Sequence, residues 1–505
     1  MDERMNETIN QLRKITKGKE LKSLIDIAER FSIAIAAGAR TEARDLLKEV
    51  FELEKKYVPL IPHNKFMSQR LQCRNMIMTV GGSKEPIILS ILCLKPQKAI
   101  LLHTDGSADT ALEIETDPDI NDIEVEITRL LITEYDASQN YRVIREQALP
   151  RISHVEKEIT LIDPTGGRKV MVASLALAAF YHRFQMVYIH SIEESGIVFP
   201  FTERLRIIEN PFEFFGDTEL GLVQEQFNCH LYEAAFNTCI QLSRKVRDAA
   251  TLTKVNCLQE LVKVYMDWDS FMHSAVPEDK RPKPPLSEKL EGIVADFQRL
   301  ALAQYLPDNI NANLEYLRKL DKTWRDNKNI VDELRLVDIF SSALRREKQK
   351  KYDDAVGRLY RCLEMSATLK LIEKGLKDTK EPDYKSFCSN INKDIKNLGI
   401  EFEKKKRRKL PNERLGLDDQ MGLLDIAGEN IARIYEGIRR RRRGSESLMD
   451  IRNRSILAHG TNPIPDNLWP EFKNKTEVVI QNTIGKDRFK NLLNMALHGQ
   501  IYIGL

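Results

Sequence analysis

The sequence predicts an α+β protein of several domains, in which an open parallel α/β sheet precedes a mostly α-helical part, with extra helices at the N-terminus and in the centre. Its 505 residues suffice for roughly two to four domains. Four short apolar runs ending in turn residues alternate with helical patterns, and beyond Pro200 apolar residues recur at helical spacing almost to the end. We therefore divide the chain into four segments, at residues 1–71, 72–200, 201–334 and 335–505.

The N-terminal segment shows helical spacing of apolar residues over residues 8–57. This spacing predicts two helices, which stop at the sequence Pro59-Leu-Ile-Pro62 because proline cannot continue a helix.

The second segment contains the four apolar runs, at residues 75–80, 99–104, 158–163 and 184–190. Strands that are apolar along their whole length are typical of a parallel sheet covered by helices on both faces. Helical patterns fall between the runs, at residues 86–94, 124–132 and 170–182. The alternation predicts a parallel α/β domain.

The helical part of the chain has a weak internal similarity. Residues 229–236 and 349–356 each place a tyrosine three residues before an alanine, at the start of an amphipathic pattern. Because small alanines let helices approach closely and only two copies occur, we expect TPR-like pairs of antiparallel helices rather than a solenoid. A Pro-rich stretch at 276–288 and a basic, loop-like stretch at 404–420 are expected connections.

Composition excludes several classes of protein. The net charge of +3 is too small for a field over the whole surface to steer nucleic acid. No apolar run reaches the roughly 18 residues of a membrane span, and the first residues lack the apolar core of a signal peptide. Seven widely spaced cysteines without a C-x-x-C pair indicate a reducing cytoplasm, without disulfides or structural zinc. No acid and histidine cluster has metal-binding spacing, so we expect no metal.

Three glycine- and hydroxyl-containing loops follow the predicted strands, at the sheet edge where ligands of parallel α/β domains bind. Glycines let a ligand approach the backbone, and helix N-termini present N–H groups to anions. Neither a Walker A loop nor a G-x-G-x-x-G fingerprint is present, which disfavours ATP hydrolysis and dinucleotide chemistry. We predict a site for a phosphate-containing or nucleotide ligand, made of Gly81, Gly82, Ser83, His103, Thr104, Asp105, Thr165, Gly166, Gly167, Arg168 and Lys169.

The richest stretch for catalysis is residues 452–459, which contains Arg452, Asn453, Arg454 and His459. Arginine neutralises a phosphodiester, and histidine exchanges a proton near neutral pH, so the stretch suits RNA cleavage without a metal. The expected products carry a 2′,3′-cyclic phosphate and a 5′-hydroxyl. On one continuous helix, Arg452 lies about 700° from His459 and on the same face, whereas Arg454 lies about 140° round the helix. We therefore favour Arg452 as the partner of His459 and keep Arg454 as the alternative.

A run of five arginines precedes this stretch, and a second basic run covers residues 404–409. Such runs usually mark a solvated helix end. The arginine run could also hold an RNA backbone without sequence preference. Its members are Arg439, Arg440, Arg441, Arg442 and Arg443.

The sequence Val80-Gly-Gly-Ser83, followed by Asp163-Pro-Thr-Gly-Gly-Arg-Lys169, resembles the CARF domain of CRISPR-associated proteins. Residues 353–364, together with residues 452–459, resemble a HEPN nuclease domain. The order of the two domains is that of the ancillary ribonucleases of type III CRISPR systems.

The resemblance implies an endoribonuclease that cleaves single-stranded RNA when a cyclic oligoadenylate binds the CARF domain, in antiviral defence. It also implies a homodimer, in which each HEPN domain contributes its arginine and histidine to one groove. Two alternatives stay open: a non-catalytic nucleotide-sensing adaptor, and a ring nuclease whose α/β domain degrades its own activator. The ring size of the activator and the base preference for RNA are not fixed by the sequence.

Overall fold

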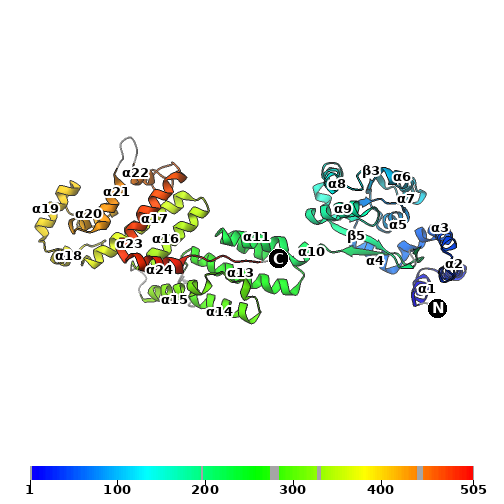
Figure 1. The fold of residues 1–505 in the computed structure, drawn as a ribbon, viewed down its shortest axis with the longest axis horizontal. Helices are drawn as coiled ribbons and strands as arrows, with labels where there is room; N and C mark the ends of the chain where they lie inside the picture. The colour runs from blue at the N-terminus through cyan, green and yellow to red at the C-terminus, as the bar shows by residue number, and fades with distance from the viewer. Residues whose placement is uncertain (1–2, 195–196, 273–283, 327–330, 441–446, 504–505) are drawn as a thin grey trace. The chain divides into compact units, whose positions relative to one another are not determined.

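The computed structural model describes residues 3–194, 197–272, 284–326, 331–440 and 447–503. It divides into two compact units, Met1–Phe214 and Phe215–Leu505, both drawn in Figure 1. The predicted order is confirmed, with an α/β unit followed by a helical one. The finer division into four segments stays a prediction. No helix in the described ranges is long and apolar enough to cross a membrane.

A six-stranded sheet with the order β3-β2-β1-β4-β5-β8 forms the centre of the first unit. The first five strands are parallel, and only β8 is antiparallel to its neighbour β5. The four strands predicted from apolar runs are confirmed as β1, β2, β4 and β5. The strands are β1 (Asn75–Thr79), β2 (Lys98–His103), β3 (Glu126–Leu131), β4 (Thr160–Asp163), β5 (Gln185–His190) and β8 (Arg204–Ile208), and β6 (Glu193–Glu194) pairs with β7 (Ile197–Val198) separately.

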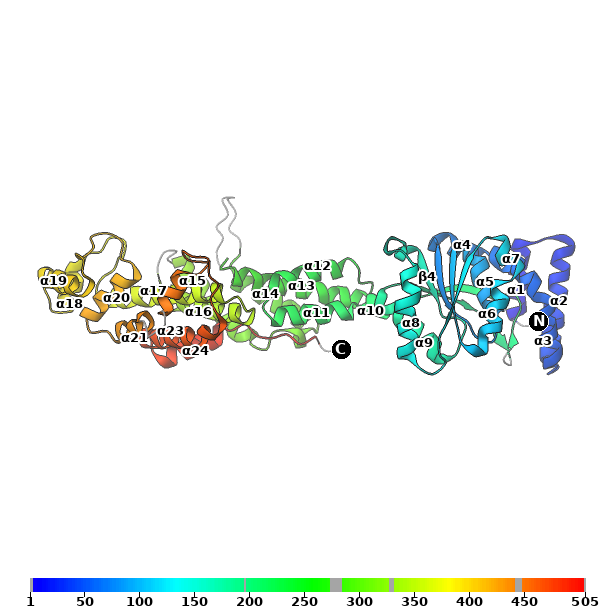
Figure 2. The same cartoon turned by 90° about the horizontal axis from the view of Figure 1, so that it is seen from above.

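Alternating side chains of the strands build two apolar layers. Met76 and Met78 of β1 face a cluster with α5 (Glu85–Leu94), α6 (Ala108–Glu115) and α7 (Pro118–Asp122). Ile77 faces the opposite cluster, with α8 (Ala137–Val143) and α9 (Lys169–His182). Figure 2 shows the two groups of helices on opposite sides of the strands. Burial on both faces explains why these strands are apolar throughout.

Two sequence predictions in this region are wrong. Residues 124–132 were expected to be helical but contain the edge strand β3, which pairs with β2 from Glu126↔Lys98 to Leu131↔His103. The segment is only partly buried, and its apolar residues fit a helical period as well as a strand period. Strand β8 lies beyond Pro200, where only helices were expected, and its pairing with β5 is a long-range contact that local spacing does not reveal.

The N-terminal helices pack on the same face of the sheet as α5. Three helices, rather than the two expected, precede Pro59, and a fourth begins at Pro62. Phe51 of the third helix lies in the apolar cluster of α5, and Phe31 meets Phe199 edge to face with ring centroids 5.2 Å apart. These helices are α1 (Glu3–Ile15), α2 (Gly18–Ala36), α3 (Arg40–Tyr57) and α4 (Pro62–Leu71).

The second unit is helical and has one continuous apolar core, from Leu220 to Ile503. After the connecting helix α10 (Pro211–Phe215), its helices are α11 (Asp217–Asn228), α12 (Tyr232–Ser243), α13 (Ala249–Asp269), α14 (Leu286–Arg299), α15 (Ile310–Asp326), α16 (Glu333–Lys348), α17 (Tyr352–Glu373), α18 (Tyr384–Asn390), α19 (Ile395–Lys406), α20 (Leu417–Ile426), α21 (Asn430–Arg439), α22 (Leu448–Asn453), α23 (Trp469–Ile484) and α24 (Lys486–Ala496).

The two similar sequence stretches form equivalent turns. His230 and Lys350 both adopt a left-handed conformation, with φ of 60° and 59°, two residues before Tyr232 and Tyr352. Each tyrosine begins the second helix of an antiparallel pair, α11–α12 or α16–α17. The turns also touch, because the Gln349 side chain donates to the His230 carbonyl at 2.7 Å. The expected helix pairs are therefore present.

The segment after α24 runs beside α11. Asn228 of α11 donates to the Ile501 carbonyl at 3.0 Å and accepts from the Ile501 N–H at 2.9 Å. Ile501 is fully buried. The last described residues therefore complete the core beside α11.

Candidate functional site

The loops after β1 and β4 meet where the strand order reverses direction. β1 and β4 are adjacent, and the chain continues outward from them to β2 on one side and to β5 on the other. Such a point is where ligands bind in open α/β sheets. The loops touch so closely that a Cβ atom on Gly81 would lie 2.6 Å from the Gly167 nitrogen, and one on Gly166 would lie 2.5 Å from the Thr79 carbonyl oxygen. Glycine is required at both positions for the loops to close on each other.

A cavity of about 1020 Å³ opens at these loops. Its volume lies at the upper end of the range for small-molecule pockets. Seven of the predicted ligand residues line it: Gly81, Gly82, Ser83, Thr165, Gly166, Gly167 and Arg168. The rest of the wall comes from α3, from the start of α5 and from the chain around the ends of β5 and β8.

The loop after β2 is not brought into this cavity. His103, Thr104 and Asp105 are absent from its lining, as is Lys169. The Thr104 hydroxyl instead contacts the Ser107 hydroxyl at 3.3 Å, in a small capping box. Of the three loops that were grouped by their residue types, the structure therefore brings two together.

Thr165 shapes its loop rather than facing the cavity with a free hydroxyl. Its hydroxyl donates to the Asp163 carboxylate and accepts from the Ile189 N–H at 3.1 Å. Asp163 is buried, and burial raises its pKa, against hydrogen bonds from Ser90 and Thr165. Arg168 is exposed and paired with Glu134 at 2.9 Å. Ser83 is exposed at the rim.

Two buried acids that line the same cavity could not be predicted from the sequence. Glu54 of α3 and Glu203, directly before β8, both line it and are each only 4% exposed. Burial raises the pKa of both carboxyl groups, that of Glu203 to about 7. The negative charge of Glu203 raises the pKa of Glu54 further. Nothing in the local sequence marks these acids, because distant elements bring them together.

The segment 452–459 is not one continuous helix, so the argument that paired Arg452 with His459 by helical rotation is wrong. Helix α22 ends at Asn453, and residues 454–460 form a compact loop. Ser455 is buried and bridges to Asn462. A Cβ atom on Gly460 would lie 2.1 Å from the Arg454 carbonyl oxygen. This close return of the chain can form only if the helix stops.

The loop nevertheless keeps the predicted catalytic residues near one another. The His459 N–H donates to the Asn453 carbonyl at 3.1 Å. Arg452 lies over the ring of Tyr360 in α17, 3.7 Å from the ring centroid, and donates to the Asn453 side chain at 3.0 Å. Asn453, Arg454 and His459 are exposed. Arg452 is half-buried against Tyr360 whereas Arg454 is exposed, and both arginines stay candidates.

The far side of the loop is fixed to the start of α17. The Ile464 N–H donates to the Asp353 carboxylate at 3.2 Å. Ile456 and Leu457 point outward at the tip, and each is 58% exposed.

The arginine run is only partly described. Arg439 ends α21 and Arg440 follows it, while Arg441, Arg442 and Arg443 lie outside the described residues. Arg439 and Arg440 border a pocket of about 470 Å³ with Lys405 and Lys406. The second basic run was expected to be loop-like, but α19 is helical as far as Lys406. Lysine has a high helix propensity, so a run of lysines can continue a helix although its charge suggested a loop.

Acidic side chains neutralise much of the positive charge of this pocket. Arg439 pairs with Asp418 at 3.3 Å and with Glu436 at 3.7 Å. Lys406 also pairs with Asp418, at 2.9 Å. The described part of the basic surface is therefore less positive than the sequence suggested.

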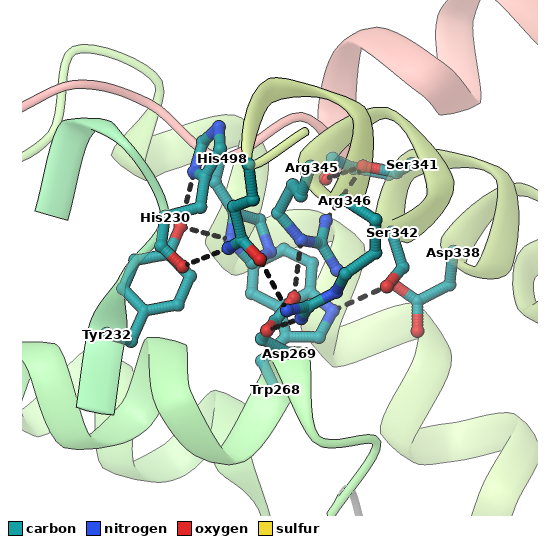
Figure 3. Close-up of polar contacts among 12 residues, drawn as sticks. His230, Tyr232, Trp268, Asp269, Asp338, Ser341, Ser342, Arg345, Arg346 and His498 are labelled. Carbon is teal, nitrogen blue, oxygen red and sulfur yellow. Dashed lines mark hydrogen bonds and ion pairs between the residues drawn. The ribbon is translucent and has the colours of Figure 1, made fainter. Parts of the chain in front are cut away.

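A buried polar network joins α13, α16 and the segment after α24 (Figure 3). Asp269, the last residue of α13, accepts from Arg345 at 2.7 Å and also from Arg346. On the other side, the Tyr232 hydroxyl contacts His230 at 2.8 Å and His498 at 2.7 Å. Burial lowers the pKa of His230 to about 3, so this imidazole is neutral.

The network continues towards the loop that carries His459. Arg346 pairs with Asp354 of α17 at 3.6 Å, and Asp354 also pairs with Arg358. The neighbouring Asp353 holds the Ile464 N–H. Charged contacts therefore extend from the end of α13 to the base of the loop.

No group of three or more histidine, cysteine, aspartate or glutamate side chains suited to a metal ion occurs within the part of the chain that the structure describes.

Comparison with known proteins finds a family match within the helical unit. Residues 324–482 match the Csm6 HEPN domain family. Among solved structures, the chain is similar to Enterococcus italicus Csm6 bound to cyclic hexa-2′-fluoro-hexa-dAMP, with 11% identity, a TM-score of 0.44 and coverage of 84% of this chain and 98% of that chain. It is also similar to Can2 from Sulfobacillus thermosulfidooxidans in complex with cyclic tetra-adenylate, with 13% identity, a TM-score of 0.23 and coverage of 47% and 71%. No curated protein shows a significant sequence match.

Proposed function

We propose that this chain is a CARF–HEPN endoribonuclease of the type III CRISPR kind that is activated by a cyclic oligoadenylate. Residues 324–482 match the Csm6 HEPN domain family. The HEPN match is the observation that carries the proposal, because it spans residues 452–459. The proposed substrate is single-stranded RNA and the proposed setting is antiviral defence in the cytoplasm.

The cavity at the glycine loops is the proposed activator site. Gly81, Gly82, Gly166 and Gly167 let phosphates approach the backbone. The first turn of α9 and the exposed Arg168 add N–H groups and positive charge. The Csm6 and Can2 structures named above were determined with cyclic oligonucleotides, and this ligand class is therefore the first to test.

In the proposed reaction, arginine holds the scissile phosphate while His459 moves a proton. The RNA 2′-hydroxyl attacks the adjacent phosphorus and the bond to the 5′-oxygen breaks. This leaves a 2′,3′-cyclic phosphate and a 5′-hydroxyl. A guanidinium stabilises the negative charge that grows on the phosphate oxygens, and an imidazole can accept or donate the proton that moves. The mechanism requires no metal ion.

We propose that two copies form the active groove. Ile456 and Leu457 are exposed next to His459, and covering them with the same loop of a second copy would bring two histidines and two sets of arginines together. A symmetric pairing of this kind uses the same patch on both partners.

A fluorogenic single-stranded RNA assay tests the proposal. Purified protein is mixed with cyclic tri-, tetra- or hexa-adenylate in the presence of a chelator. We expect one ring to stimulate cleavage and His459→Ala to abolish it. Binding of a ring without cleavage would favour the nucleotide-sensing adaptor. Linear product from the ring alone would reveal ring nuclease activity in addition.

A further inference from the structure

The Glu54 and Glu203 carboxyls lie at the ligand-binding edge of the sheet although they come from outside the parallel strands. Glu203 directly precedes Arg204, which pairs with His190 at the carboxyl end of β5. The antiparallel direction of β8 therefore places Glu203 beside the loops after β1 and β4. Glu54 arrives from α3, whose Phe51 packs into the cluster beneath α5.

One oxygen of this pair has no partner. The Glu54 carboxyl accepts from the Phe201 N–H at 3.2 Å. The Glu203 Oε2 atom is buried and makes no hydrogen bond to any described residue. Burying a carboxyl oxygen without a hydrogen-bond partner destabilises the folded protein. Glu203 lines a cavity large enough for a ligand.

The charged groups around the pair favour a neutral ligand group. Glu85 of α5 and Glu193 of β6 also line the cavity. The charge of Arg204 lowers the pKa of Glu203, and its Nη1 atom donates to the Phe201 and Glu203 carbonyls at 3.1 and 2.9 Å. Lys48, Arg168 and Tyr188 also line the cavity. Cys93 of α5 is a further titratable neighbour that is buried, and its pKa is raised by that burial and by Glu203. Phosphates would be repelled here, whereas a hydrogen-bond donor would be attracted.

We propose that Glu203, together with Glu54, recognises the exocyclic amino group of an adenine base of the bound activator. The proposal rests on the proposed activator site and names its specificity-determining residues. The amino N–H donates to the unpartnered Glu203 oxygen. A protonated carboxyl can also donate to the neighbouring ring nitrogen, which makes two parallel hydrogen bonds to the same base. The phosphates lie at the glycine loops.

Burial of the pair supports this assignment, because it keeps a proton on the site near neutral pH. The pKa of Glu203 is raised to about 7 by desolvation. A carboxyl that is protonated near neutral pH can be both donor and acceptor, as the edge of adenine requires. A glutamine has the same two capacities and no charge, and is therefore the conservative variant.

The test is a binding titration of the full chain with the activating cyclic oligoadenylate and with the same ring built from purine nucleosides, which lack the amino group. The wild-type protein is expected to bind the adenine ring about tenfold or more tightly than the purine ring. Glu203→Gln is expected to keep that preference. Glu203→Leu is expected to reduce it to within about twofold. Glu49→Gln, an exposed position on α3, is the matched control.

The outcomes separate this inference from the proposed function. If no cyclic oligoadenylate binds the wild-type protein, the proposed activator is wrong and the inference falls with it. If the wild-type protein binds both rings equally, or if folded Glu203→Leu keeps the full preference, the inference is wrong while the activator stands. Thermal unfolding establishes whether each variant is folded. If Glu203→Leu does not fold, Glu203→Gln still tests the inference, because it is expected to keep the preference for the adenine ring.

Discussion

The Arg452 guanidinium carbon lies 3.7 Å from the centroid of the Tyr360 ring. A cation over an aromatic face is stabilised by about 0.5–2 kcal/mol, so Tyr360 fixes the position of one of the two candidate catalytic arginines. Tyr360 itself comes from α17, which also fixes the base of the loop that carries His459 through Asp353.

Replacing Tyr360 therefore tests which arginine acts. If Arg452 holds the phosphate, Tyr360→Phe keeps activity within about threefold, because the aromatic face remains, whereas Tyr360→Leu lowers kcat about tenfold. Single-turnover RNA cleavage at saturating activator measures this. Arg361→Ala, at an exposed arginine on the same helix, is the control. Equal rates in the phenylalanine and leucine variants would indicate that Arg454, rather than Arg452, holds the phosphate.

Direct replacement of the polar residues gives a second test of the site. We expect His459→Ala to lower the single-turnover rate at least 100-fold, while activator binding stays unchanged because the loops at Gly81 and Gly166 are in the other unit. Arg452→Ala and Arg454→Ala, measured side by side, assign the phosphate contact. A His459→Ala protein with wild-type cleavage would exclude this loop as the active site.

The buried acid Glu203 predicts how stability depends on pH. Its pKa is about 7 in the folded protein, against an ordinary value of 4.5. The folded state therefore binds more protons than the unfolded state between these values, and the free energy of unfolding falls as pH rises through this window. The full effect is on the order of 3 kcal/mol. Glu203→Gln removes the charge, so its thermal midpoint is expected to exceed that of the wild type at pH 8 and to converge with it near pH 5. A wild-type midpoint that rises between pH 5 and pH 7, relative to the variant, would contradict the assignment.

The arginine run predicts the salt dependence of RNA binding. Each arginine that contacts a phosphate contributes a slope of about −0.7 in log K against log salt for a single strand. We expect Arg439→Ala and Arg440→Ala each to reduce the slope by up to that amount. The effect is smaller for Arg439, which is 48% exposed and pairs with Asp418 and Glu436, than for Arg440, which is 77% exposed and pairs with Glu436. Arg318→Ala, at an exposed ion pair with Glu291, is the control. An unchanged slope in both variants would show that these two arginines do not contact RNA phosphates.

Asp269 is expected to be important for the stability of the second unit. Burial alone would raise its pKa, but the charges of Arg345 and Arg346 outweigh burial and lower it. Asp269→Ala leaves two guanidiniums without their shared acceptor, which in buried sites costs about 3–5 kcal/mol. Urea unfolding measures the loss, and Asp296→Ala, at an exposed pair with Arg299, is expected to cost under about 1 kcal/mol. Equal costs would show that the network is not a major source of stability.

The sequence predicted what depends on local pattern and missed what depends on distant contacts. β1, β2, β4 and β5 were predictable because burial on both faces makes them apolar throughout. The edge strand β3 has only a partial pattern and was taken for a helix. The helix predicted through His459 was wrong because the chain turns back at Gly460 onto Arg454, and the spacing of residue types does not reveal this local turn. Glu203 could not be predicted as part of the site, since the antiparallel pairing of β8 and the packing of α3 create its surroundings.

The pairing of Asn228 with Ile501 joins residues 273 positions apart, and this separation has a consequence for synthesis. The helix that carries Asn228 leaves the ribosome long before the segment that completes its packing. Contacts of such separation are slow to form because a long loop must first close. During translation α11 therefore stays incompletely packed until the segment around Ile501 has been synthesised. A chain that stalls before this segment would expose the apolar side of α11 and be open to proteolysis.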